Sequence, residues 1–120
     1  MIGFVDSGGR ALLDVRLKPD AEADDAIVTA WIDTGFTGDL VLPASAIQEL
    51  SLSLSGTVRA VLADGSQVAM KTYSCVIEWF GEWQHLEVVA STAEYPLLGV
   101  GLLLDHELQI DYSSKKVALS

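Results

Sequence analysis

The chain has 120 residues, which fits a single domain over residues 1–120, and with 50% hydrophobic and only 20% charged residues it can bury a sizeable core. Seven basic against 17 acidic residues give a formal net charge of −10, which repels phosphate backbones and argues against nucleic acid as a partner. No apolar run approaches the ~20 residues that cross a bilayer, and the start Met1–Val5 lacks the basic residues of a signal peptide. The single cysteine forms no internal disulfide. We therefore expect a cytoplasmic protein with no membrane partner.

The first elements are two short strands. Ile2–Leu17 reads as a hairpin around Asp6–Arg10, because its two glycines can supply the positive φ of a tight reversal. Lys18–Asp25 follows with a proline and four acidic residues, which is typical of a solvated loop. Without a histidine or a glycine-turned ligand loop, this acidic cluster does not indicate a metal site.

The centre of the sequence is Asp33-Thr34-Gly35, set between an extended apolar run, Ile27–Ile32, and a second one, Leu40–Leu42. A carboxylate at the end of a strand and the start of a tight loop can be held rigidly and still face a cleft, as a catalytic acid or base requires. Asp33 is therefore the leading candidate for catalysis. Beyond it, Pro43 and the helical spacing of Ala44–Leu50 predict a short helix packed on the sheet.

A second hairpin follows. Thr57–Leu62 and Val68–Tyr73 are β-prone and flank Ala63-Asp64-Gly65-Ser66, and Asp-Gly between extended runs is a strong hairpin signal. From the local sequence alone, an ordinary surface turn is the favoured interpretation.

The segment Cys75–Ala90 reads as a further hairpin that turns near Gly81. Five of its residues are expected to be core or half-buried: Val76, Trp79, Trp83, Leu86 and Val88. A buried free thiol at Cys75 is favoured over a Cys75/His85 nucleophile and base, because no motif surrounds the cysteine. His85 and His106 lie too far apart in sequence to make a recognisable zinc site.

The chain ends with a short apolar helix expected within Val100–His106, a half-buried strand at Glu107–Tyr112, a turn at Ser113–Lys116 and a last strand, Val117–Leu119. Such terminal strands are candidates for pairing across a dimer.

Two of these elements resemble a known family. Asp33–Gly35, preceded by Trp31-Ile32 and followed by Leu40–Pro43, resembles the active-site motif of aspartic proteases. Roughly 65 residues later, Pro96–Gly99 resembles the two hydrophobic residues plus glycine found in the single-lobe, retroviral-protease-like members. The resemblance covers most of the chain from about Ile27 onward. It implies an all-β fold: a closed, barrel-like acid-protease lobe with a flap hairpin and one or two short helices.

The resemblance also implies a mechanism. Aspartic proteases cleave peptide bonds with two carboxyl groups that share one proton, because two like charges about 3 Å apart cannot both ionise. This chain has one Asp-Thr-Gly, so a homodimer would bring the Asp33 of each subunit together on its two-fold axis. The expected substrate is a peptide or protein, and no cofactor or metal is implied.

Individual roles follow from the matching positions. Thr34 would bond across the dyad to its symmetry partner, and the Gly35 amide could bond to Asp33. Phe36 replaces the small residue of viral members and would bring a bulky ring near the substrate channel, while Thr37-Gly38 resembles the variant of bacterial relatives.

Two more segments take their meaning from the resemblance. The hairpin at Ala63, Asp64, Gly65 and Ser66 lies where the family has its flap, whose backbone groups would bind an extended peptide. Gly99 would allow close packing beside the Asp33 loop. Val100-Gly101 stands where viral members carry a charged pair that ties the dimer together, so dimer strength is open.

Two other hypotheses remain. The first is a protease-like domain that holds a peptide or dimerises without cutting, since fold does not decide function. The second is a soluble all-β domain in which Asp33 only caps a turn. Asp33→Asn separates the three: an enzyme loses cleavage, a binder keeps its ligand, and a turn-capping aspartate loses stability. In each case, so acidic a chain is expected to disfavour acidic peptides near its cleft.

Overall fold

A computed structural model describes residues 1–120 and consists mainly of strands. The strands are β1 (Ile2–Val5), β2 (Ala11–Lys18), β3 (Ala26–Ile32), β4 (Leu40–Pro43), β5 (Ser53–Val61), β6 (Gln67–Trp79), β7 (Glu82–Ser91), β8 (Leu97–Leu98), β9 (Leu108–Asp111) and β10 (Lys116–Leu119). The two helices are α1 (Ala44–Glu49) and α2 (Val100–Leu103). The expected all-β class with short helices is confirmed.

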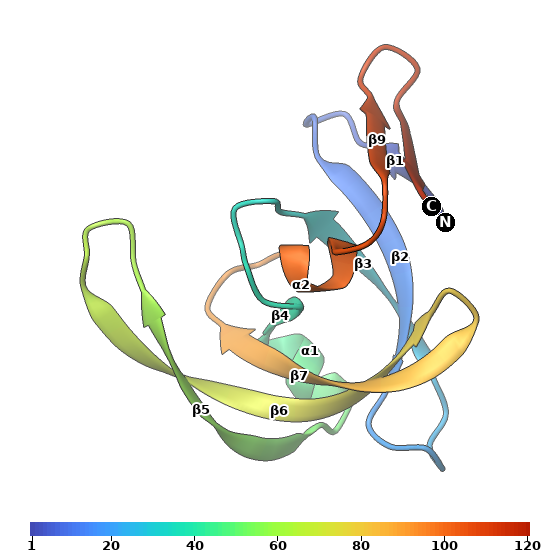
Figure 1. Ribbon diagram of the computed structural model, residues 1–120. Helices are drawn as coiled ribbons and strands as arrows, with labels where there is room; N and C mark the ends of the chain where they lie inside the picture. Colours follow the sequence, from blue (N-terminus) through green and yellow to red (C-terminus); the bar gives the residue numbers. More distant parts are fainter.

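All ten strands belong to one sheet that curls back on itself (Figure 1). Its order is β5-β6-β7-β4-β8-β3-β2-β1-β10-β9, and an additional pairing between β6 and β2 closes the strands from β6 to β2 into a ring. In this closing pair, Leu17 lies opposite Ile77. The ring agrees with the closed lobe that the resemblance implies.

The core fills the inside of the ring, because successive strand residues point to opposite faces. In β2, Leu13, Val15 and Leu17 are buried, whereas Asp14 and Arg16 between them are exposed. This alternation of two is the pattern by which the sequence indicates a half-buried strand.

One of the core expectations is wrong. Val76, Trp79, Leu86 and Val88 are buried or half-buried, but the Trp83 side chain is 42% exposed. In β7 the buried residues Leu86 and Val88 fall on even positions, so position 83 faces outward. The Lys18 ammonium covers the outward-facing Trp83 ring at 4.0 Å from its centroid.

The strand β6 is longer than expected, because the runs that begin at Val68 and Cys75 form one strand of 13 residues. Its second half pairs with β7, up to Thr72 opposite Val89, and with β2. From Met70 to Gln67 it pairs with β5 alone. The β5–β6 hairpin therefore extends beyond the ring as a two-stranded arm, which Figure 1 shows on the left.

Strands β1, β10 and β9 continue the sheet on the other side of β2, and both chain ends lie beside them (Figure 1). Glu107 and Ser120 exchange two backbone hydrogen bonds of 3.0 Å. Because hydrogen-bonded pairs alternate along antiparallel strands, the N–H and C=O groups of Leu108 and Ile110 point away from β10. These groups form a free sheet edge, since β9 pairs with no other strand.

The helices are short. Helix α1 follows Pro43 directly and buries Ile47, and α2 follows Gly99 and buries Leu102. Neither is long enough to cross a membrane.

Candidate active site

Asp33 lies immediately after β3, where β3 and β8 run parallel. Its backbone N–H donates to the Leu98 carbonyl at 2.8 Å, which ties the start of the loop to β8. The Gly35 amide donates to Asp33 Oδ1 at 2.9 Å, and the Phe36 amide donates to the Asp33 carbonyl at 3.2 Å. The carboxylate is thus half-buried and fixed in orientation, while Thr34 and Gly35 are exposed.

Residues 33–39 form the Asp33 loop, which packs on the segment after β8. The Val100 amide donates to the Phe36 carbonyl at 2.7 Å, and the Gly101 amide donates to the Gly38 carbonyl at 3.0 Å. A Cβ added to Gly99 would lie 2.2 Å from the Gly38 carbonyl oxygen. Only a glycine at position 99 allows the two backbones to approach this closely.

The Phe36 ring lies across two glycines. A Cβ at position 38 would approach Phe36 Cζ at 2.5 Å, and one at position 99 would approach Phe36 Cδ2 at 2.4 Å. The bulky ring therefore fits the loop because Gly38 and Gly99 leave room for it. It also lines the cavity beside the loop.

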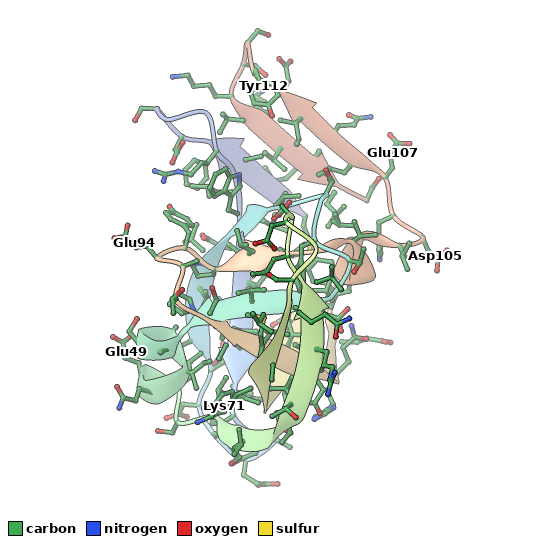
Figure 2. All side chains as sticks on the ribbon, turned by 90° about the vertical axis from the view of Figure 1, so that its left-hand side faces the viewer. Glu49, Lys71, Glu94, Asp105, Glu107 and Tyr112 are labelled. Atoms are coloured by element: carbon green, nitrogen blue, oxygen red, sulfur yellow. The ribbon has the colours of Figure 1, made fainter.

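A cavity of about 670 Å³ separates the Asp33 loop from the β5–β6 hairpin. Its lining comprises 13 residues, eight of them hydrophobic: Gly35, Phe36, Thr37, Gly38, Val41, Val58, Arg59, Ala60, Val61, Met70, Val89, Ser91 and Leu97. None is acidic, although the chain carries a net charge of −10. Figure 2 shows Glu49, Glu94, Asp105 and Glu107 at the periphery of the molecule instead.

The hairpin tip is a compact turn and does not line this cavity; the residues of the two arms do. Asp64 Oδ1 accepts the Ser66 amide at 2.9 Å and the Ser66 hydroxyl at 2.6 Å, and these bonds hold the Asp64 pKa below its usual value. Gly65 has φ +86°, as the Asp-Gly pattern predicts. Ala63, Asp64, Gly65 and Ser66 are all exposed.

A second cavity, of about 390 Å³, is lined by Asp33 itself, with Trp31, Ile32, Thr34 and Leu97. The Asp33 carboxylate thus lies next to open space.

An aromatic cluster adjoins this second cavity through Trp31, and no sequence pattern predicts it. The Arg10 guanidinium lies 4.6 Å from the Tyr95 ring centroid and 5.9 Å from that of Trp31. It is held by Asp6, whose Oδ2 is 2.8 Å from Arg10 Nε, and hydrogen bonds from Arg10 lower the Asp6 pKa. The sequence shows an arginine, Arg10, directly after the first glycine turn. Only the fold brings Arg10 close to Tyr95.

Burial shifts the pKa of two further side chains. Burial raises the pKa of Asp39, at the end of the Asp33 loop. Burial also raises the pKa of the Cys75 thiol to about 11, and Cys75 faces the core whereas His85 is exposed. A thiolate nucleophile at Cys75 is therefore disfavoured, in line with the expected buried thiol.

No protein-family model and no curated protein sequence matches the chain. Solved structures do. A retropepsin-like aspartic protease from Rickettsia conorii is 16% identical, with 99% of this chain and 88% of that chain covered and a TM-score of 0.68. EIAV protease, complexed with the inhibitor HBY-793, is 17% identical over 83% of this chain and 90% of that chain, with a TM-score of 0.59. Simian foamy virus (mac) protease is 18% identical over 76% of this chain and 91% of that chain, with a TM-score of 0.50. At these identities the likeness establishes a common fold.

Proposed function

We propose that this chain, which has the fold of retropepsin-like aspartic proteases, is an aspartic endopeptidase that acts as a homodimer. One observation carries the proposal: a carboxylate, Asp33, is fixed by the Gly35 amide on a loop that lines a largely apolar cavity under a projecting hairpin. A rigid, accessible carboxylate beside a peptide-sized cleft is what amide hydrolysis by this chemistry requires.

The mechanism needs two such carboxylates. With the Asp33 of each subunit on the two-fold axis, the pair would share one proton. The ionised Asp33 takes a proton from water, and the protonated one donates a hydrogen bond to the scissile carbonyl oxygen. Water then attacks the carbonyl carbon, and the amine leaves after it receives a proton from the dyad. The Gly35 amide at Oδ1 holds each carboxylate in a fixed orientation toward its partner.

The β5–β6 hairpin would act as the flap. An extended peptide between the hairpin and the Asp33 loop would contact Val58, Val61 and Met70 on one side and Phe36 and Leu97 on the other. This lining favours apolar substrate side chains next to the scissile bond. Backbone groups of Ala63–Ser66 would bind the peptide main chain if the tip closes over it.

The free edge of β9 is the surface that we propose for the dimer. The site is incomplete without a second Asp33, and β1 and β10 already have partners on both sides within one chain. Two β9 strands related by a two-fold axis could pair antiparallel through the backbone groups of Leu108 and Ile110. The edge carries neither proline nor lysine, the residues that commonly block such pairing.

The deciding experiment is cleavage of a mixed peptide library from acidic to neutral pH by wild type and Asp33→Asn, at a concentration where sedimentation shows a dimer. We expect cleavage by wild type and a loss of about 10⁴-fold or more in kcat in the variant, as for removal of a group that touches the reacting atoms. Asp24→Asn, the same substitution at an exposed residue of the loop after β2, is the control, and it should keep the activity.

A well-folded dimer that cleaves nothing at any pH would contradict the proposal and favour a peptide-binding module. Equal activity in wild type and Asp33→Asn would assign the cleavage to a contaminant or to another site. A marked loss of stability in Asp33→Asn would instead favour the role of a turn cap.

A further inference from the structure

The β5–β6 hairpin extends beyond the ring from the point where β6 no longer pairs with β7. From Ser74 to Thr72, β6 is flanked by both β5 and β7, and from Lys71 to Gln67 only β5 pairs with it. The arm beyond this level supplies five of the 13 cavity-lining residues: Val58, Arg59, Ala60, Val61 and Met70. A two-stranded arm has little stiffness of its own, so contacts at its base decide its angle over the cavity.

The base carries a β-bulge. The register of β5 against β6 shifts between Leu54 and Gly56, so Ser55 has no residue opposite it. A bulge bends the strand and re-aims its side chain. Here Ser55 Oγ lies 3.0 Å from Thr72 Oγ1 on β6, and the Ser55 hydroxyl also donates to the Glu87 carboxylate on β7.

These two bonds have a fixed direction. Serine has one hydroxyl proton, and a carboxylate can only accept, so the Ser55 proton goes to Glu87. The Thr72 hydroxyl must then be the donor to Ser55 Oγ. Thr72 is 5% exposed and is the one polar side chain among the buried residues, so its hydroxyl needs this partner.

We infer that Ser55, Thr72 and Glu87 form a clasp that joins β5, β6 and β7 at one level and holds the hairpin at a set angle over the cavity. They are positioning residues, because they act on a bound peptide only through the hairpin. The hydrogen bond to the carboxylate is charge-assisted and so is the stronger of the two. The effect of the clasp on catalysis rests on the proposed function. Its effect on the angle of the hairpin does not depend on that function.

The clasp is tested by measuring the hairpin angle directly. Spin labels are attached at Ala63→Cys on the exposed tip and at Glu49→Cys on α1, and labelled protein is diluted with unlabelled protein so that each distance lies within one chain. Cys75 stays in place because it is buried. The variants are Ser55→Ala and, since Glu87 is exposed and its loss should not impair folding, Glu87→Ala. Ser53→Ala is the matched control, because Ser53 lies on the same strand and is not one of the three clasp residues.

We expect Ser55→Ala and Glu87→Ala to lengthen and broaden the tip-to-α1 distance distribution, and Ser53→Ala to leave it unchanged. Ser55→Thr retains the hydroxyl and should restore the wild-type distribution. In cleavage assays the clasp variants should raise KM by about tenfold, as for loss of one charge-assisted hydrogen bond, with kcat changed less than about twofold.

Identical distance distributions for wild type, Ser55→Ala and Glu87→Ala would overturn the clasp. The two proposals fail separately. If wild type cleaves no peptide but the distances shift, the clasp stands and the peptidase assignment fails. If wild type cleaves peptides but the distances do not change in the variants, the peptidase assignment stands and the clasp fails.

Discussion

Phe36 and Gly99 share one small space at the base of the Asp33 loop. The ring extends over the glycine, and backbone bonds from Val100 and Gly101 hold the loop from the same side. The position of Asp33 therefore depends on residues that carry no reactive group. A side chain at position 99 would have to displace either the ring or the loop backbone.

Gly99→Ala tests this dependence. The added methyl group would lie 2.2 Å from a backbone oxygen that cannot move alone, so we expect a loss of about 3 kcal/mol in the free energy of unfolding, together with loss of cleavage. Urea unfolding measures the first effect. Gly8→Ala is the control, because its nearest atom would be 3.5 Å away, and its cost should stay within about 1 kcal/mol. Equal costs for the two variants would contradict the packing argument.

The turn at Asp111 is stabilised in a pH-dependent way. Hydrogen bonds from Ser113 and Ser114 lower the Asp111 pKa from 3.8 to about 2 in the folded chain. The folded state thus binds this proton less readily than the unfolded state, so the stabilisation is complete above about pH 4 and disappears as pH falls toward 2.

The measurement compares the free energy of unfolding of wild type and Asp111→Asn between pH 5 and pH 2, a range set by this pKa. The advantage of wild type should shrink as the pH falls. A difference between the two proteins that does not change with pH would show that Asp111 ionisation does not stabilise this turn.

At the scale of elements, the sequence predicted turns better than it predicted what the strands between them do. The Asp-Gly pair identified the hairpin tip, because the φ of +86° at Gly65 is a local requirement. The arms begin earlier than expected, at Ser53, and they line the cavity while the tip does not. Their role depends on the bulge at Ser55 and on β6 continuing into the ring, which involve partners far away in sequence. Asp33 itself could be found from its motif, whereas the contact of Arg10 with Tyr95 could not.

The free edge of β9 gives an element-scale prediction. Proline at position 110 removes an N–H that points away from β10, so it should block pairing between two chains while it keeps the hydrogen bonds within one. We expect Ile110→Pro to be monomeric by sedimentation and inactive. Ile110→Ala is the matched control, because it loses the same packing and keeps the N–H. A dimer of Ile110→Pro as tight as that of Ile110→Ala would exclude the β9 edge as the interface.

At the scale of the whole molecule, charge and shape act against each other. The ring and its cavity suit an apolar peptide, while a net charge of −10 makes two copies of the chain repel. The sequence gives this net charge, but it could not predict that no acidic residue lines the cavity. It also implied a closed lobe only through resemblance, because the closing pair of Leu17 and Ile77 joins residues some 60 positions apart in the chain.

We therefore expect the dimer to tighten with salt. Screening shortens the range of the repulsion to about 10 Å at 0.1 M ionic strength, and added salt should lower the dimer dissociation constant by about tenfold between low and moderate salt. Sedimentation equilibrium in sodium chloride measures this constant. An interface held mainly by ion pairs would give the opposite trend, with weaker association as salt rises.

The closing pair of the ring has a further consequence. Next to it, the Cys75 thiol donates a hydrogen bond to the Lys18 carbonyl at 3.6 Å across the join between β6 and β2. A thiol reagent cannot reach Cys75 while this join is intact, since the side chain is fully buried. Labelling must wait for local unfolding, and its rate then reports how often the two strands separate. The single cysteine is thus a natural reporter of how often the ring opens, in a protein that needs no introduced probe for the purpose.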